Sequence, residues 1–161
     1  MIEDFKLGMR HLAGAVTVVT AAGGASAVGL TATAVCSLSM EPPRLLVCLN
    51  RAGATYGALA RNNAFCVNVL GIDGRDLAEA FAGRTGLAGA DKFADAGWIF
   101  EEGHAPRLDS AICAIRCSVH SMTIVGTHAI VIGDVTAVWN RPDLTPLVYH
   151  DRMFQTLSPL A

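Results

Sequence analysis

The sequence predicts a mainly β protein, an antiparallel sheet or β-barrel with a few peripheral helices. Short runs rich in Val and Thr are separated by Gly and Pro, and only a few short segments have helical spacing. The dinucleotide fingerprint GxGxxG is absent, as is the strand–helix alternation that accompanies it. With 161 residues, the chain is expected to form a single domain over 1–161.

The composition limits the class of protein. Hydrophobic residues make up 52% of the chain and charged residues 16%, so we expect a sizeable core. A formal charge of -2 without a basic run disfavours nucleic-acid binding. The uncharged stretch between Leu12 and Met40 contains too many hydroxyl residues and glycines to span a membrane. Five cysteines without a CxxC pair, and an N-terminus without an apolar signal core, favour a reducing, cytoplasmic setting.

The first part of the chain predicts a helix and a hairpin. Apolar residues at helical spacing indicate a short amphipathic helix over 3–12. The runs 15–21 and 27–38 are rich in Val and Thr and predict two strands. We expect the turn between them at Gly23 and Gly24.

Buried strands and short helices alternate in the middle of the chain. Uninterrupted apolar runs predict strands over 44–50 and 64–70. Short helices are expected over 55–61 and 75–82.

The last part of the chain begins with a segment that has no regular pattern, and strands follow it. Residues 83–103 have no clean period and predict a loop with at most a short helix. The run 112–120 alternates and predicts a half-exposed strand with Arg116 on its solvent face. A long β-branched strand over 127–139 and a short last strand over 146–150 follow.

The cysteines are expected to be core residues. Cys113 and Cys117 lie about 13 Å apart along a strand at ~3.3 Å per residue, and His120 points to the opposite face, so a metal site is disfavoured. Cys36, Cys48 and Cys66 lie inside apolar strand patterns, where free Cys behaves as a small hydrophobe.

Hydroxyl side chains alternate along the predicted strand 27–38 and its end. They are Thr31, Thr33, Ser37 and Ser39. Because Thr is favoured in strands, a solvated strand face explains the pattern without any function. Alternatively, the hydroxyls form a polar wall for a ligand rich in acceptors, such as a ribityl chain or a phosphate.

A second candidate site follows the strand 44–50. Asn50, Arg51, Ala52 and Thr55 lie in a small-residue loop just before a predicted helix. Free N–H groups, the helix dipole and a cation together favour an anion. An N-capping role for Thr55 explains the same loop equally well.

Six segments occur in a characteristic order along the chain. They are GLTATAVCSLSMEPPRLLVCLN (29–50), FCVNVL (65–70), FAG (81–83), KF (92–93), VGTH (125–128) and LVYHDRMF (147–154). Together they cover nearly the whole chain, and the set resembles the short-chain flavin reductase family, the reductase components of two-component flavin-dependent monooxygenases. The resemblance implies an FMN-binding split β-barrel, usually a homodimer. In this family FMN or FAD takes a hydride from NADH or NADPH, and the reduced flavin leaves for a separate monooxygenase.

The resemblance also implies roles for individual residues. The flavin wall would be Thr31, Ala32, Thr33, Ala34, Ser37 and Ser39, and the phosphate loop Asn50, Arg51, Ala52 and Thr55. The turn Phe81, Ala82 and Gly83 would close over the flavin, with Lys92 nearby. The residues bordering the nicotinamide would be Gly14, Val16, His128 and Tyr149. A lone His in a strand is usually structural, but His128 follows GT as in the family, and we expect it to position the nicotinamide rather than act as an obligatory acid.

Two departures from the family pattern keep other functions open. Ala52 stands where many relatives carry Ser, and the stretch 13–16 lacks the bulkier residue or proline common there. One alternative is a flavoprotein with a fixed flavin that reduces another acceptor. A second is a non-enzymatic flavin-binding module with a blocked nicotinamide side. A third is a β domain that uses its hydroxyl strand for protein contacts. No isolated basic pair marks a 2′-phosphate site, which favours NADH over NADPH.

Overall fold

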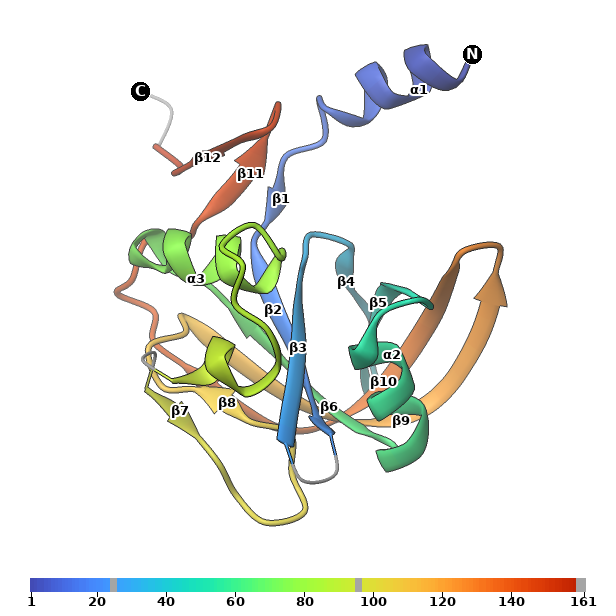
Figure 1. Ribbon diagram of the computed structural model, residues 1–161, viewed down its shortest axis with the longest axis vertical. Helices are drawn as coiled ribbons and strands as arrows, with labels where there is room; N and C mark the ends of the chain where they lie inside the picture. Colours follow the sequence, from blue (N-terminus) through green and yellow to red (C-terminus); the bar gives the residue numbers. More distant parts are fainter. Residues whose placement is uncertain (24–25, 95–96, 159–161) are drawn as a thin grey trace.

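The computed structural model describes residues 1–23, 26–94 and 97–158, and its centre is a seven-stranded antiparallel sheet (Figure 1). The strand order is β3-β2-β6-β9-β10-β5-β4. These strands are β2 (Thr17–Gly23), β3 (Ser26–Ala32), β4 (Val35–Met40), β5 (Pro43–Asn50), β6 (Ala64–Val69), β9 (Cys113–Val125) and β10 (His128–Asn140). One hydrophobic core receives side chains from all seven, so the sheet is rolled, yet its edges β3 and β4 are not neighbours in the order. This is a split barrel, and the predicted mainly β fold is confirmed.

Smaller elements surround the sheet. One small sheet contains β1 (Gly14–Ala15), β11 (Val148–His150) and β12 (Met153–Gln155). A second contains β7 (Trp98–Ile99) and β8 (Arg107–Leu108). The helices are α1 (Ile2–Met9), α2 (Ala54–Asn62) and α3 (Arg75–Phe81), with 3-10 turns η1 (Ile72–Gly74) and η2 (Gly89–Phe93). The four predicted helical segments are thus confirmed within a few residues. The strands β7, β8 and β12 were not predicted, and β7 lies in the segment 83–103 that was expected to be a loop. Within the described residues, no helix is long and apolar enough to cross a membrane.

The predicted hairpin is present, but its second strand is shorter than predicted. β2 pairs with β3 as expected, although Gly24 of the predicted turn lies outside the described residues. The predicted strand 27–38 is two strands, because β3 ends at Ala32 and β4 begins at Val35 on the opposite edge of the sheet. The run of Val, Thr and Ala continues through the break without a Gly or Pro to mark it.

The central sheet is packed on both faces. Val19, Phe65 and Val131 belong to the core inside the rolled sheet. Val18 and Cys66, their neighbours along the strands, belong to a second core together with side chains of α3 and η2. A period-2 pattern therefore does not mark a solvent face in this protein.

Arg116 corrects the prediction of a half-exposed strand over 112–120. Its residue exposure is only 8%. The guanidinium lies 4.9 Å from the centre of the Trp139 ring and donates to Glu101 at 2.9 Å. Stacking and ion pairing satisfy the charge, which allows an arginine to occupy a packed face.

The cysteines agree with the prediction of core thiols in part. All five are free, and burial raises the pKa of the Cys66 and Cys117 thiols to about 12. Both thiols are therefore poor nucleophiles at neutral pH. Cys36, by contrast, is exposed because it lies on the edge strand β4.

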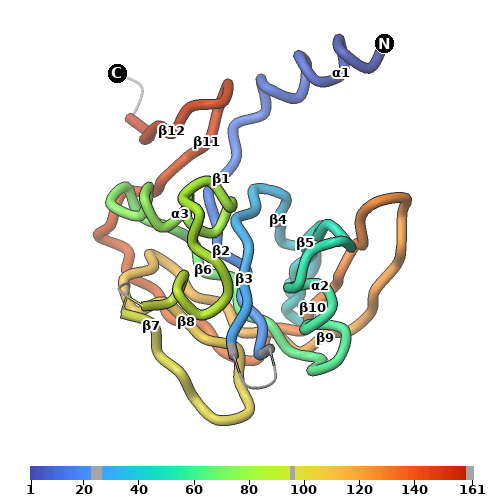
Figure 2. The backbone as a smooth tube through the Cα atoms, in the orientation of Figure 1, coloured from blue at the N-terminus to red at the C-terminus, as the bar shows by residue number. Residues whose placement is uncertain are grey.

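Helix α1 lies apart from the sheet. Figure 2 follows the backbone from α1 through a short extended segment into β1. None of its residues is buried, and Ile2 and Phe5 are 65% and 67% exposed. The predicted amphipathic helix is therefore present, but its apolar face has no partner within the described chain.

Close packing between β6, β9 and β10 requires a glycine at position 133. A Cβ on Gly133 would lie 2.5 Å from Cζ of Phe65 and 2.8 Å from Cβ of Cys117, both buried. We expect Gly133→Ala to lower the free energy of unfolding by ~1–3 kcal/mol, the usual penalty for overpacking. Urea denaturation followed by circular dichroism measures the change. Gly8→Ala is the control, because a Cβ there meets nothing within 4 Å. Equal denaturation midpoints for the two variants would contradict the packing described.

Candidate functional site

Two adjoining cavities form one groove at the end of β3. We call them the Asn50 half, of about 290 Å³, and the Tyr149 half, of about 190 Å³. The Asn50 half is lined by Leu30, Thr31, Ala32, Thr33, Ala34, Cys48, Asn50, Phe81, Ala82 and His128. The Tyr149 half is lined by Val16, Thr31, Ala32, Thr33, Ala82, Arg84, Tyr149 and Phe154. The two halves share a wall of Thr31, Ala32, Thr33 and Ala82, which we call the common wall.

The common wall is held by the link between the sheet edges. The N–H of Val35 donates to the carbonyl of Thr33, and the N–H of Cys48 to that of Ala34, both at 3.0 Å. On the other side, the hydroxyl of Thr31 donates to the carbonyl of Ala78 in α3 at 2.6 Å. That hydroxyl therefore anchors α3, and its oxygen can only accept a hydrogen bond from a ligand.

Glycines allow close approach at two points beside the wall. A Cβ on Gly29 would lie 2.7 Å from Cε1 of Phe81, so the absence of a side chain lets the Phe81 ring rest on β3. A Cβ on Gly14 would lie 3.1 Å from Cβ of Thr33. Gly14 thus borders the wall without lining either cavity.

The structure gathers ten of the predicted site residues in the groove. Both halves are lined by Thr31, Ala32, Thr33 and Ala82. The Asn50 half alone is lined by Ala34, Asn50, Phe81 and His128, and the Tyr149 half alone by Val16 and Tyr149. The predicted residues that line neither half are Gly14, Ser37, Ser39, Arg51, Ala52, Thr55 and Gly83.

Two of the predicted patterns do not hold in space. Thr31 lies on β3 and Ser37 on β4, at opposite edges of the sheet, so the four hydroxyls do not share one strand face. The N-cap of α2 is Gly53, so the capping interpretation of Thr55 is wrong. Thr55 is instead buried inside α2 with 3% exposure.

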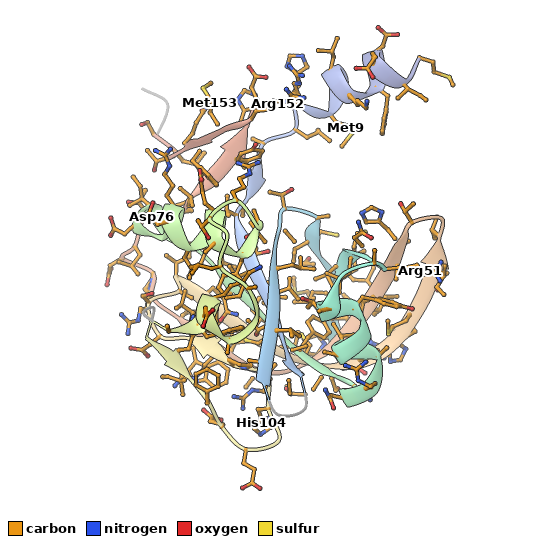
Figure 3. The ribbon with its side chains drawn as sticks, viewed as in Figure 1. Met9, Arg51, Asp76, His104, Arg152 and Met153 are labelled. Carbon is orange, nitrogen blue, oxygen red and sulfur yellow. The ribbon has the colours of Figure 1, made fainter. Side chains whose placement is uncertain are left out.

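The loop after β5 is fixed to the turn between β9 and β10. The side-chain oxygen of Asn50 accepts from the N–H of Ala52 at 3.0 Å. The N–H of Arg51 donates to the carbonyl of Thr127 at 3.0 Å, and its guanidinium to that of Gly126 at 3.3 Å. Figure 3 shows Arg51 beside this hairpin. A cation and the first N–H groups of α2 thus lie next to the Asn50 half, an arrangement that suits an anion.

His128 begins β10 and pairs with Asn50 across the sheet. Its Nδ1 lies 2.8 Å from the hydroxyl of Thr127, and the ring is exposed. His128 lines the Asn50 half, whereas Tyr149 lines the other half. The two residues expected to border the same ligand therefore lie at opposite ends of the groove.

Sequence reasoning missed Arg84 and Phe154. Arg84 follows the turn Phe81, Ala82 and Gly83 directly, and its guanidinium lies 3.5 Å from the hydroxyl of Tyr149. The Phe154 ring packs edge-on against Tyr149, with ring centres 5.2 Å apart. The position of Arg84 after the turn was the available signal, but a single exposed Arg carries little information without a cavity beside it.

A larger cavity, of about 450 Å³, lies elsewhere, between η1, β8 and the segment after β10. Its charged lining residues are Asp73 and Arg141, and Arg141 is paired with Asp109 at 3.1 Å. Because Arg141 is already paired and the carboxylate of Asp73 would repel an anion, this cavity is poorly suited to bind a phosphate. None of the predicted site residues lines this cavity, so we assign the candidate site to the groove.

Comparison with known proteins places this geometry in a family. The flavin reductase like domain model matches residues 9–158. An FMN reductase (NADH) RutF from Stutzerimonas stutzeri strain A1501 is 40% identical over 156 residues, covering 97% of this chain and 88% of that protein.

Solved structures agree with this match. A flavin reductase domain protein from Arthrobacter sp. FB24 has a TM-score of 0.90 and 28% identity, covering 100% of this chain and 98% of that one. BorF, the flavin reductase component of a bacterial two-component tryptophan halogenase, has a TM-score of 0.88 and 28% identity, covering 99% and 100%. On its sequence match, its split barrel and these likenesses, the chain belongs to the flavin reductase-like family.

Proposed function

We propose that this protein is an NADH:flavin oxidoreductase, which transfers a hydride from NADH to FMN and supplies the reduced flavin to a separate monooxygenase component. The common wall carries the proposal, because one row of small side chains borders two adjoining cavities. A flavin ring and a nicotinamide ring would meet along this wall. The names of the relatives support the proposal: RutF is an FMN reductase (NADH), and BorF belongs to a two-component system.

The residues of the groove fit a flavin. Ala32 and Ala82 keep the common wall flat, while Ala34 and Phe81 add apolar surface in the Asn50 half. When bound, the flavin supplies the hydride-accepting chemistry. The chain would hold the two rings in contact, and such orientation can account for ~7–11 kcal/mol of a reaction barrier.

The loop after β5 would hold the flavin phosphate. We expect Arg51→Ala to raise the KM for FMN about tenfold, because a charge-assisted contact contributes ~1.5–3 kcal/mol. The KM for riboflavin, which has no phosphate, should stay unchanged. Steady-state kinetics with both flavins provide the measurement, and Arg61→Ala, in the last turn of α2, is the control. An equal rise for FMN and riboflavin would show that Arg51 acts through the fold and not through a phosphate.

His128 would position the nicotinamide. We expect His128→Ala to raise the KM for NADH much more than it lowers kcat, since the lost contact would orient the donor. His104→Ala is the control, because His104 is exposed in the loop before β8, far from the groove (Figure 3). A fall in kcat with an unchanged KM would contradict this role.

Free flavin distinguishes the proposal from its alternatives. With NADH followed at 340 nm, the rate should rise steeply as free FMN is added, because the reduced flavin must leave before the next turnover. A rate that is already maximal without added flavin would instead indicate a fixed flavin and another acceptor. Flavin binding without NADH oxidation would indicate a binding module.

We infer four further properties. FAD is also accepted, because it shares the ring, the ribityl chain and the first phosphate with FMN, and NADH is preferred over NADPH. The chain acts in the cytoplasm, which is supported by five free thiols. Residues 1–161 form one domain, which is supported by a family match from 9 to 158 and by the pairing of β1 with β11.

We also infer a homodimer in which the partner subunit completes the groove. Each half of the groove is smaller than the ~300 Å³ of a typical ligand pocket. The outward face of β5 and β10 carries half-buried Leu46, Ile130 and Ile132. Together with the apolar side chains of α1, this face provides an extended surface that a second copy would cover.

Removing α1 tests the homodimer. A chain lacking residues 2–9 should have the mass of a monomer in light scattering and a higher KM for FMN than the full chain. Its circular dichroism spectrum should remain that of a folded β protein, because α1 contains no buried residue. A truncated chain that remains dimeric, or a full chain that is monomeric, would refute this role of α1.

A further inference from the structure

The position of Arg84 is set by the way α3 ends. The N–H of Gly83 donates to the carbonyl of Ala80 at 3.1 Å, and the N–H of Arg84 to that of Glu79 at 3.0 Å. Gly83 has a φ of +76°. These are the features of a Schellman motif, in which the residue after the helix adopts a left-handed conformation that favours Gly. The motif fixes the backbone of Arg84 at the rim of the Tyr149 half.

The charge of Arg84 has no carboxylate partner among the described residues. Its only polar side-chain contact there is the 3.5 Å approach to the hydroxyl of Tyr149, a long contact with a neutral group. Arg75, at the other end of the same helix, is paired with Glu79 at 4.0 Å. Arg84 is also the one charged side chain that lines the Tyr149 half. The groove therefore presents an available guanidinium to any anion that enters this half.

A cation lies at each end of the groove. Arg51 flanks the Asn50 half together with the first N–H groups of α2, and Arg84 lines the Tyr149 half. The proposed reaction brings two anionic molecules to the groove, a flavin with one phosphate and a dinucleotide with a pyrophosphate. If the loop at Arg51 takes the flavin phosphate, the second cation remains for the dinucleotide.

We propose that Arg84 binds the pyrophosphate of NADH and so sets the position from which the nicotinamide enters the groove. This inference rests on the proposed function. An arginine suits the task, because its guanidinium donates two parallel hydrogen bonds to neighbouring phosphate oxygens. The Tyr149 hydroxyl, which Arg84 approaches at 3.5 Å, is released when the guanidinium turns to the phosphates.

A hydride donor without phosphates tests the inference. Arg84→Ala should raise the KM for NADH about tenfold or more, as expected for the loss of charge-assisted hydrogen bonds. The KM for 1-benzyl-1,4-dihydronicotinamide should stay within twofold of that of the unmodified protein. Arg84→Lys should restore part of the affinity for NADH, since it keeps the charge but not the paired hydrogen bonds. Arg61→Ala, in the last turn of α2 and in the lining of neither half, is the control and should leave both KM values unchanged.

The possible outcomes separate this inference from the proposed function. An Arg84→Ala protein whose KM rises for FMN and not for NADH would overturn it, as would equal losses with both hydride donors. An unchanged KM for NADH in an active Arg84→Ala protein would also overturn it while leaving the reductase function intact. If the unmodified protein fails to oxidise NADH with FMN, the proposed function itself is wrong. Calorimetric titration with NAD⁺ at two salt concentrations provides a readout besides turnover, because the salt dependence should weaken in Arg84→Ala.

Discussion

The link of Thr33 and Ala34 between the two edges of the sheet is the constraint on which the rest of the structure depends. β3 ends on one side of it and β4 begins on the other, at opposite ends of the strand order. A two-residue link spans at most about 10 Å from the end of β3 to the start of β4, so the edges must lie close together at this point. The sheet therefore rolls around one core, yet no ladder closes it. The opening left at the link is where the groove lies.

The elements around this opening determine the shape of the groove. Thr33 of the link lines both halves and Ala34 lines the Asn50 half. The hydrogen bond from Thr31 to Ala78 holds α3 against the end of β3. The end of α3 then fixes Arg84 through the Schellman motif, and the end of β5 fixes Arg51 through its bonds to the β9–β10 turn. Rigid elements thus hold the two cations apart, so that the small wall between them remains free for flat rings.

Local patterns predicted the elements well because each has a signal of its own. Most strands and helices were found within a few residues, since apolar period and Pro or Gly boundaries are local features. The break at Thr33 was missed because its cause is tertiary: the chain, although its residues suit a strand, crosses there from one edge of the sheet to the other. Arg116 was placed on a solvent face because its partners, Trp139 and Glu101, come from other segments of the chain.

The site was predicted in its composition and less well in its arrangement. The ordered family motifs named most of the wall, but the spacing of the hydroxyls suggested one continuous face that does not exist. Ser37 was predicted to line the site because it continues the alternation of hydroxyls in the sequence, but it lies on β4, at the other edge of the sheet. Arg84 has no periodic signal, and its significance depends on a cavity formed by the segment after α3, by β11 and β12, and by the end of β3.

A crystal structure of the protein with FMN tests the central claim most directly. The account predicts that the flavin ring lies along Thr31, Ala32, Thr33 and Ala34, with its phosphate at Asn50 and Arg51. Flavin bound away from this wall, for instance in the larger cavity beside Leu144 and Arg141, would contradict it.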